Sequence, residues 1–237
     1  MKPVISSFGM LVRQIVSDGM LIVVCFASVL AGFFFRFALP WLEGVLCAYF
    51  REPSILEPYY RLFDMVLNLL TPYMLCFATA MVMLDEYDQN MIGYMAITPL
   101  QKSGYILSHL VVPAVLSALV SILLVYLFHL SAWSWPVLIG TSLLSGVSGF
   151  TVALFLFAFS HNKVEGMAMA KLSGLILLGL PIPFFVHSNG QYLFIPLPSY
   201  WMARFCLEGN VVFFLVALVL SMAYIPWFYH QVTRKII

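Results

Sequence analysis

Between Lys102 and Lys163 the chain carries no Asp, Glu, Lys or Arg for 60 residues, 103–162. As one helix this run would be about 90 Å long at 1.5 Å per residue. Crossing the roughly 30 Å hydrocarbon core of a bilayer takes only about 20 residues, so the run predicts two membrane spans. The break between them falls at SAWSWP, residues 131–136, where Ser, Trp and Pro favour an interfacial turn.

The other long uncharged stretches predict further spans. Hydrophobic residues make up 63% of the 237 residues and charged residues 9%, a composition far more apolar than that of soluble domains. Four more apolar segments of span length hold at most one charged residue each, and they are residues 19–41, 65–84, 168–186 and 210–229. We therefore expect an all-α integral membrane protein with six transmembrane helices, forming a single domain over residues 1–237.

Lys and Arg in the loops indicate the orientation, because they gather on the cytoplasmic side. With both termini cytoplasmic, that side holds Lys2, Arg13, Lys102, Lys163, Lys171, Arg234 and Lys235, whereas the outer side holds Arg51, Arg61 and Arg204. Arg36, at the outer end of the first span beside Trp41, is expected to extend to the headgroups rather than bind a substrate. The expected layout places residues 1–18 at the interface and 85–102 in the cytoplasm. Residues 42–64 and 187–209 then lie outside, the second partly re-entering the membrane, in a multi-pass protein of the cell membrane.

Several kinds of chemistry are not indicated. A net charge of +1 without clustered Lys and Arg argues against nucleic-acid binding. The four cysteines have no metal-ligand spacing and the five histidines form no HExxH motif, so no metal site is predicted. Whether Cys47 and Cys206 pair is left open. No GxxxxGK[ST] occurs, so ATP hydrolysis would require another polypeptide.

Two alternative functions remain in view at this point. Gly146-Val147-Ser148-Gly149 spells the GxSG of intramembrane serine proteases, but the last span offers only His230, at its very end, as a base. Close helix packing by Ser142, Gly146, Ser145 and Gly149, in pairs four residues apart, explains the motif better. An ion- or proton-coupled transporter with helices broken at Pro113, Pro181 and Pro183 stays open.

The most unusual loop is DEYDQNMIGYMAITPL, residues 85–100, which puts three acids directly before an amphipathic stretch. Negative charge is favoured at a helix N-terminus, so we expect a short helix over residues 89–97 that Pro99 ends. Its acids would be repelled by an anionic membrane surface. A groove with basic residues on another protein is therefore its expected partner.

These residues resemble those of type 2 ATP-binding-cassette (ABC) transporter permeases, and in particular the subfamily of fluoroquinolone exporters. Its coupling helix, between spans two and three, has a glutamate, then a glycine, then Thr-Pro, as at Glu86, Gly93 and Thr98-Pro99. The stretches HNKVEG (161–166) and LPSYW (197–201) resemble two further segments of that subfamily, in the same order. The chain departs from the pattern at residues 88–90 and at His109, where a lysine is common, which puts the partner contacts in doubt.

The resemblance implies the transmembrane permease of an ATP-driven exporter of an amphipathic substrate such as a drug, peptide or lipid. The permease is not itself an enzyme: a separate ABC ATP-binding subunit binds ATP and Mg, and a second permease subunit, identical or different, completes a dimer in the lipid. It implies contact with the ATPase subunit for Asp85, Glu86, Asp88, Met91, Gly93, Tyr94, Thr98 and Pro99. A secondary cytoplasmic contact is implied for Asn162, Lys163, Glu165 and Gly166, with Lys163 and Glu165 able to pair, and an outer gate for Pro196, Pro198, Tyr200 and Trp201. No catalytic or cofactor-binding residue is expected in this chain.

Overall fold

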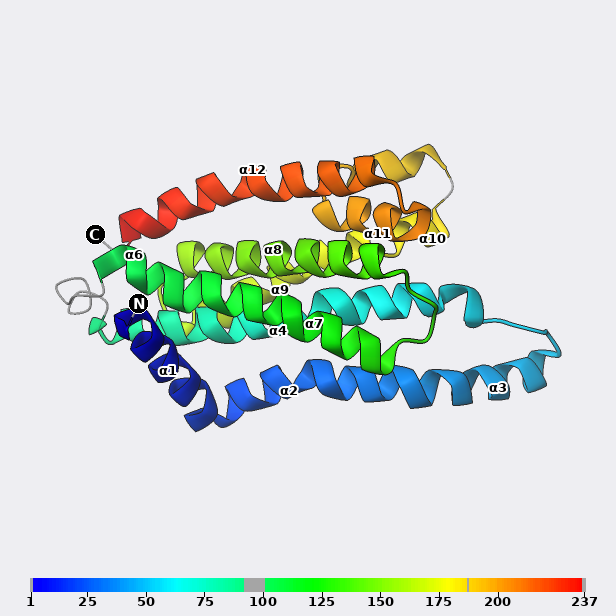
Figure 1. Ribbon diagram of the computed structural model, residues 1–237, viewed down its shortest axis with the longest axis horizontal. Coiled ribbons are helices and arrows are strands. Elements are labelled where there is room, and N and C mark those ends of the chain that lie inside the picture. The colour runs from blue at the N-terminus through cyan, green and yellow to red at the C-terminus, as the bar shows by residue number, and fades with distance from the viewer. Residues whose placement is uncertain (1, 92–100, 187, 236–237) are drawn as a thin grey trace.

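The computed structural model describes residues 2–91, 101–186 and 188–235. Within them the chain is a bundle of helices without strands, so the all-α prediction is confirmed. Five helical segments are long and apolar enough to cross a membrane: Gly19–Phe50, Glu57–Asp88, Ser103–Phe128, Trp135–Phe159 and Val211–Lys235. The described ends of the chain, α1 and the last turn of α12, lie at the same end of the bundle (Figure 1). We call this the terminal end and the other the distal end.

The first two helices meet at Asp18. Helix α1, Lys2–Ser17, packs its buried Ser7 and Leu11 against the bundle, and α2, Gly19–Phe33, begins where the Asp18 carboxylate accepts the Met20 and Leu21 amides. Helix α2 continues through the π-helical turn η1, Phe34–Ala38, into α3, Leu39–Phe50. The predicted loop over 42–64 is therefore wrong in extent, because the apolar run keeps its helical form to Phe50. Helix α3 projects beyond the bundle at the distal end (Figure 1).

Helix α4, Tyr60–Asp88, follows the short 3₁₀ turn η2, Glu57–Tyr59, and forms the centre of the bundle. Most of its residues are buried among α2, α7 and α8. The chain resumes with α6, Gln101–Ile106, the π-helical turn η3, Leu107–Val111, and α7, Val112–Phe128. Helix α8 covers Trp135–Phe159, so the predicted break at 131–136 separates α7 from α8 as expected.

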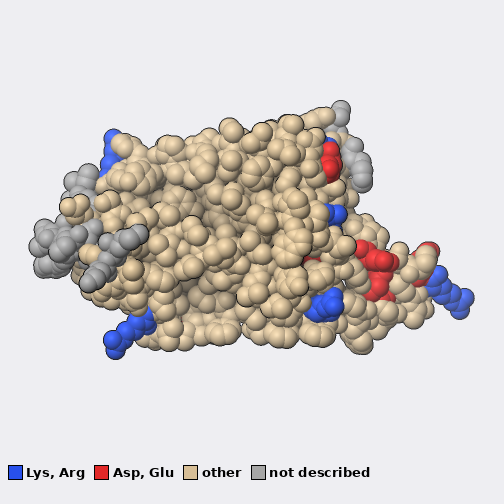
Figure 2. Space-filling view, in the orientation of Figure 1, with Lys and Arg blue, Asp and Glu red and all other residues tan. Residues whose placement is uncertain are grey.

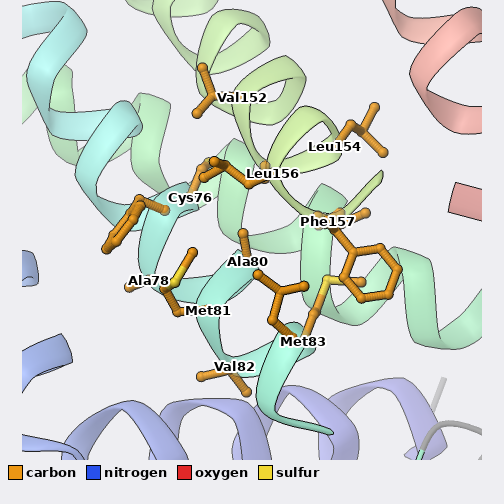
Figure 3. Packing of buried hydrophobic residues seen from close by; sticks show 14 of the residues in the cluster. Cys76, Ala78, Ala80, Met81, Val82, Met83, Val152, Leu154, Leu156 and Phe157 are labelled. Atoms are coloured by element: carbon orange, nitrogen blue, oxygen red, sulfur yellow. The ribbon is translucent and has the colours of Figure 1, made fainter. Parts of the chain in front are cut away.

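Close packing joins α4, α7 and α8. A Cβ on Gly149 would lie 2.8 Å from the Pro72 carbonyl oxygen of α4, and one on Gly146 would lie 2.8 Å from the Ala118 Cβ of α7. The GxSG motif thus lets three helices approach one another, and the Ser148 hydroxyl donates to the Leu144 carbonyl of its own helix. Apolar side chains of α4 and α8 interleave beside this contact (Figure 3).

The predicted fifth span, 168–186, is not one helix. It divides into α9, Lys163–Ser173, the 3₁₀ segment η4, Gly174–Gly179, and α10, Ile182–Phe185. Pro181 has no amide hydrogen and therefore interrupts the helical hydrogen bonds. Gly179 lies so close to α11 that a Cβ on it would be 2.7 Å from the Tyr200 amide nitrogen. After η5, Asn189–Phe194, come α11, Pro198–Glu208, and α12, Val211–Lys235.

Charges in the described residues lie mainly toward the two ends, and the face between them is uncharged (Figure 2). At the distal end, Arg36 donates to the His129 carbonyl at 2.8 Å, which ties η1 to the α7–α8 connection. All four cysteines, each within the described part of the chain, are free thiols, and Cys206 accepts from Arg61 Nε at 3.4 Å. The structure therefore holds no Cys47–Cys206 bridge.

Candidate functional site

The acidic residues of the 85–100 segment lie in the last turn of helix α4. Asp85, Glu86 and Asp88, which were predicted to precede a short helix over 89–97, themselves form the last turn of α4, because the helix of the apolar run 65–84 continues through them. Asp85 and Asp88 are exposed, whereas Glu86 is only 3% exposed. Negative charge is disfavoured at a helix C-terminus, so the buried Glu86 carboxylate depends on donors from other elements.

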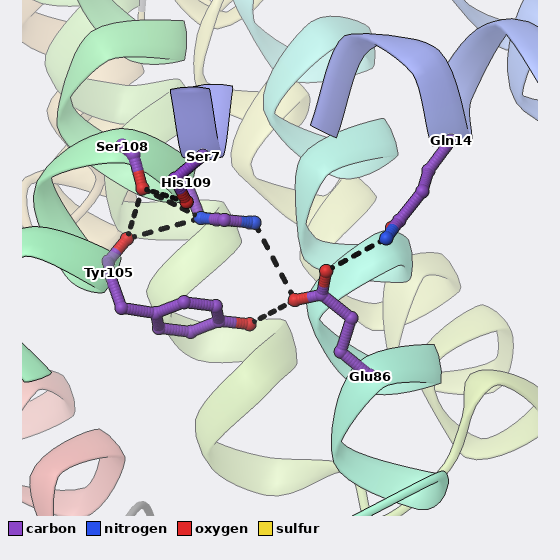
Figure 4. A network of polar contacts seen from close by, with 6 residues as sticks. All are labelled: Ser7, Gln14, Glu86, Tyr105, Ser108 and His109. Atoms are coloured by element: carbon purple, nitrogen blue, oxygen red, sulfur yellow. Dashed lines mark hydrogen bonds and ion pairs between the residues drawn. The ribbon is translucent and has the colours of Figure 1, made fainter. Parts of the chain in front are cut away.

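Three side chains from two distant parts of the chain surround Glu86 (Figure 4). The Tyr105 hydroxyl of α6 donates to Oε2 at 2.7 Å, and Gln14 Nε2 of α1 donates to Oε1 at 3.0 Å. His109 Nε2 of η3 lies 3.5 Å from Oε2. Glu86 therefore joins α1, the end of α4 and the start of the third membrane helix.

The contacts extend from Glu86 to a second link with α1. The Tyr105 ring stacks on His109 with centroids 4.2 Å apart, and His109 Nδ1 lies 2.9 Å from the Ser108 hydroxyl oxygen. That hydroxyl is 3.0 Å from the Ser7 hydroxyl. Ser108 and His109 belong to the π-helical turn η3, a form of helix that is frequent at functional sites. We call Ser7, Gln14, Glu86, Tyr105, Ser108 and His109 the Glu86 network.

The Glu86 network lies on both chain flanks of residues 92–100. Asn90 and Gln101, just outside that segment, have left-handed backbones with φ of 57° and 54°. Met91 is 38% exposed and follows the end of α4. Gly93, Tyr94, Thr98 and Pro99, with most of the expected helix over 89–97, lie outside the described residues, so their assignment stays a prediction.

In the segment 162–166, where a secondary contact was predicted, Lys163 and Glu165 have different partners from those expected. Asn162 caps α9 by accepting the Glu165 amide at 2.9 Å, and Glu165 returns to accept the His161 amide at 2.7 Å. The arrangement resembles a capping box, except that Glu165 accepts the amide of the residue before the N-cap rather than that of the N-cap itself. Glu165 is therefore engaged by the backbone and does not form the pair with Lys163 that the sequence allowed. Lys163 instead forms an ion pair with Asp18 at the α1–α2 junction. Its hydrogen bond to Asp18 holds the pKa of that carboxyl below the ordinary value.

Gly166 brings α9 against the end of α4. A Cβ there would lie 2.5 Å from Leu84 Cδ1 and 2.7 Å from Met81 Cε. A crevice of about 460 Å³ lies where the α1–α2 junction, the end of α4 and the start of α9 meet, and it is lined by Gln14, Ser17, Asp18, Gly19, Leu21, Val82, Asp85 and Lys163. Asp85, from the described part of the contact predicted over 85–99, and Lys163, from the one predicted over 162–166, thus line the same crevice.

Sequence reasoning missed the role of Lys235. Its ammonium donates to the Phe157 carbonyl at 2.6 Å and to the Ser160 carbonyl, so it caps the C-terminal end of α8. It also lies 4.4 Å from the Tyr87 ring centroid and 4.5 Å from that of Phe157. A lysine at the end of an apolar helix was the available signal, but its target is 75 or more residues away in sequence.

The residues predicted to form an outer gate hold a segment that folds back into the bundle. Pro198 begins α11, Tyr200 is 1% exposed, and Trp201 Nε1 donates to the Ile195 carbonyl at 2.8 Å. The Pro196 carbonyl accepts from the Tyr224 hydroxyl at 3.1 Å. Tyr224 lies about 20 Å along α12 from its first residue, so residues 196–198 enter the bundle from the distal end.

Comparison with known proteins places the chain in a family. A family model described as "Fluoroquinolones export permease protein Rv2686c-like" matches residues 11–229. Two curated relatives from Mycobacterium tuberculosis, the fluoroquinolones export permease proteins MT2760 (strain CDC 1551 / Oshkosh) and Rv2686c (strain ATCC 25618 / H37Rv), are each 29% identical over 152 residues. Each alignment covers 62% of this chain and 59% of the relative's length. No solved structure matches the chain significantly.

Proposed function

Because the chain belongs to the Rv2686c-like family of fluoroquinolones export permeases, we propose that it is the membrane-spanning subunit of an ATP-driven exporter. In this proposal the cell membrane is the bacterial cytoplasmic membrane, with the terminal end of the bundle inside. The substrate is an amphipathic compound, and the two relatives are named for fluoroquinolones. A separate ABC subunit binds ATP and Mg, and a second permease subunit completes the transporter.

The Glu86 network is the observation that carries this proposal. A force applied to residues 92–100 by an ATPase subunit reaches α4 on one side and α6 on the other. Glu86 and Tyr105 stand at those two positions, joined by a hydrogen bond of 2.7 Å, and Gln14 adds α1 to the same carboxylate. Movement of the segment is thereby passed to three elements together. Two states with different packing at this network would give the ATPase the differential contact that a conformational change requires.

The surface beside this network suits a partner with basic residues. Asp85 and Asp88 are exposed at the end of α4, and the adjacent crevice contains Asp85 and Asp18 against one lysine, Lys163. The predicted partner contacts at 85–91 and 162–166 therefore form one docking surface in this proposal, with Met91 at its edge.

Site-directed cross-linking tests the partnership. Met91→Cys, in a chain with Cys25 and Cys47 changed to Ser, is expected to cross-link to a co-purified P-loop ATPase, with a yield that changes when ATP is added. Tyr49→Cys is the matched control, since Tyr49 is 79% exposed but lies on the projecting α3. Equal cross-linking from both positions, or none to a nucleotide-binding protein from Met91, would remove the basis for the proposal.

A proton-coupled transporter without an ATPase is the second candidate, and one observation favours it. Glu86 and His109 are titratable groups 3.5 Å apart and buried within membrane helices, where such groups often belong to proton pathways. Transport into inverted membrane vesicles separates the two functions. Uptake of a fluoroquinolone that requires ATP and survives collapse of the proton gradient supports the exporter, and the reverse pattern supports the alternative.

A further inference from the structure

A cavity of about 280 Å³ lies within the single chain, between α8, the α9–η4 segment, the start of α11 and α12. Its lining is apolar except for a few hydroxyl groups, and it contains no Asp, Glu, Lys, Arg or His. Leu172 and Leu175, which are 55% and 54% exposed, stand at its edge, so the cavity opens sideways from the bundle. A cavity of about 150 Å³ holds one benzene ring, so this one has room for about two rings.

One hydroxyl in this lining differs from the others. Ser148 donates to the Leu144 carbonyl and Thr151 to the Val147 carbonyl, as serine and threonine ordinarily do in a helix. Ser221, on α12, is 2% exposed, and within the described part of the chain its hydroxyl has no hydrogen-bond partner. Leaving a buried polar group without a partner is unfavourable, and an acceptor on a ligand in the cavity would remove that cost.

The depth of Ser221 limits what that ligand can be. Ser221 lies 10 residues from the start of α12, or about 15 Å, close to the middle of a hydrocarbon core of about 30 Å. A phospholipid held by its headgroup keeps its ester carbonyls at the interface and could present only methylene groups there. A small molecule dissolved in the membrane can bring an acceptor to this depth.

We infer that this cavity is a binding site for a small, uncharged amphipathic molecule of about two rings, whose carbonyl or ether oxygen accepts a hydrogen bond from Ser221. The rings occupy the apolar lining between Phe155, Ile176 and Phe228. The oxygens of Ser148 and Thr151 remain able to accept, so a second, donor group on the ligand is tolerated. This inference concerns binding to one chain and does not depend on the proposed ATPase partner.

Benzophenone is a suitable probe, because it has two rings and a carbonyl acceptor, and on illumination it inserts into nearby C–H bonds. With the purified chain in lipid nanodiscs, labelling is expected to saturate and to map by mass spectrometry to peptides from α8, η4 and α12 that line the cavity. Diphenylmethane, which has a methylene in place of the carbonyl, is expected to compete more weakly. Saturable labelling confined to other surfaces, or labelling that never saturates, would overturn the inference.

Two substitutions of Ser221 distinguish the contribution of its hydrogen bond to binding from the contribution of the cavity volume. Ser221→Ala is expected to weaken benzophenone binding about three- to tenfold and to leave diphenylmethane competition unchanged, since a neutral hydrogen bond contributes about 1 kcal/mol. Ser221→Leu partly fills the cavity and is expected to weaken both benzophenone binding and competition by diphenylmethane. Ser199→Ala is the control, because Ser199 is also buried without a partner among the described residues but does not line the cavity. An equal loss in the Ser199 and Ser221 alanine variants, with the same thermal unfolding, would contradict the assignment.

Discussion

Helix α4 carries a buried carboxylate near each of its ends, and the two are held in different ways. Asp64 at the distal end is 1% exposed and Glu86 at the terminal end is 3% exposed. They are separated by 86 − 64 = 22 residues, or about 33 Å of helix. Each is the polar centre of its end of the bundle, so the difference between them indicates how the two ends can behave.

All the hydrogen bonds that the Asp64 carboxylate accepts come from one short stretch of chain, residues 130–133. Its carboxylate accepts the Leu130 amide at 2.9 Å, the Ser131 amide at 3.0 Å, the Ser131 hydroxyl at 2.7 Å and the Trp133 indole at 2.9 Å. Two of the four donors are backbone groups, which cannot turn away without unfolding the α7–α8 connection. The distal end is therefore fixed around this carboxylate.

The Glu86 carboxylate is contacted only by side chains, which come from α1 on one side and from α6 and η3 on the other. Gln14, Tyr105 and His109 can each leave the carboxylate through a change of rotamer, while their helices remain intact. The side chains at the terminal end are therefore able to exchange partners, as the proposed coupling to an ATPase subunit would require. The comparison predicts a rigid distal end and an adjustable terminal end.

The largest expected effect is at the rigid end. Asp64→Asn removes the charge and turns an NH₂ donor toward other donors, so at least one buried group loses its partner. We expect a loss of about 3 kcal/mol in unfolding free energy, measured by denaturant titration in detergent. Glu208→Gln, at an exposed residue whose Oε1 lies 3.7 Å from Arg204 Nε, should change stability by less than about 0.5 kcal/mol. Equal effects of the two substitutions would mean that Asp64 does not hold the distal end.

Glu86→Gln is expected to have a smaller effect on stability and a more local effect on motion. The glutamine keeps one carbonyl acceptor for Tyr105 or Gln14, so the expected loss is about 1–2 kcal/mol. Hydrogen exchange should rise in α1 and η3 and remain unchanged around residues 129–133. Asp88→Asn, on the exposed side of the same turn, is the control. A loss larger than that of Asp64→Asn would reverse the comparison.

Lys235 tests whether the terminal end is held by more than the Glu86 network. Lys235→Met keeps most of the aliphatic stem but removes the donors to the Phe157 and Ser160 carbonyls, and we expect a loss of about 1 kcal/mol. Arg234→Met is the matched control, since Arg234 is exposed. The measurement is the unfolding free energy of both variants, and identical values would show that the capping of α8 contributes nothing.

The sequence was enough to predict most of the fold, because charge is so costly in a membrane that its absence marks the spans. The break between α7 and α8 falls where Ser, Trp and Pro predicted it. The prediction of a single span over 168–186 was wrong because it rested on hydropathy alone. The shape of the segment is set by Gly179, which packs closely against α11, and by the break in the helix at Pro181. The extension of the first span to Phe50 was also missed, since a projecting apolar helix has no distinct sequence signal.

The sequence was enough to locate the candidate site, but not to predict which of its residues are buried or which side chains contact one another. The cluster of acids at 85–88 indicated a special segment, yet nothing local distinguishes Glu86, which is buried, from Asp85 and Asp88, which are exposed. Its donors Gln14 and Tyr105 are 72 and 19 residues away. Lys163 and Glu165 were expected to be able to pair, but the fold gives Lys163 an ion pair with Asp18 instead.

The smallest expected effect is the pH dependence of the pair between Asp18 and Lys163. Asp18 has a folded-state pKa below its ordinary value, so its contribution is fully present above the unfolded pKa of about 3.9 and is lost as pH falls through the folded value. Asp18→Asn keeps the cap on α2, because asparagine is also a good N-cap, and removes the charge. The wild type should therefore be more stable than the variant at pH 6, by less than about 1 kcal/mol because the pair is partly exposed to solvent. This difference should shrink by pH 3. A difference that is the same at both pH values, or that is unchanged in a Lys163→Met background, would show that the terminal end does not depend on this pair.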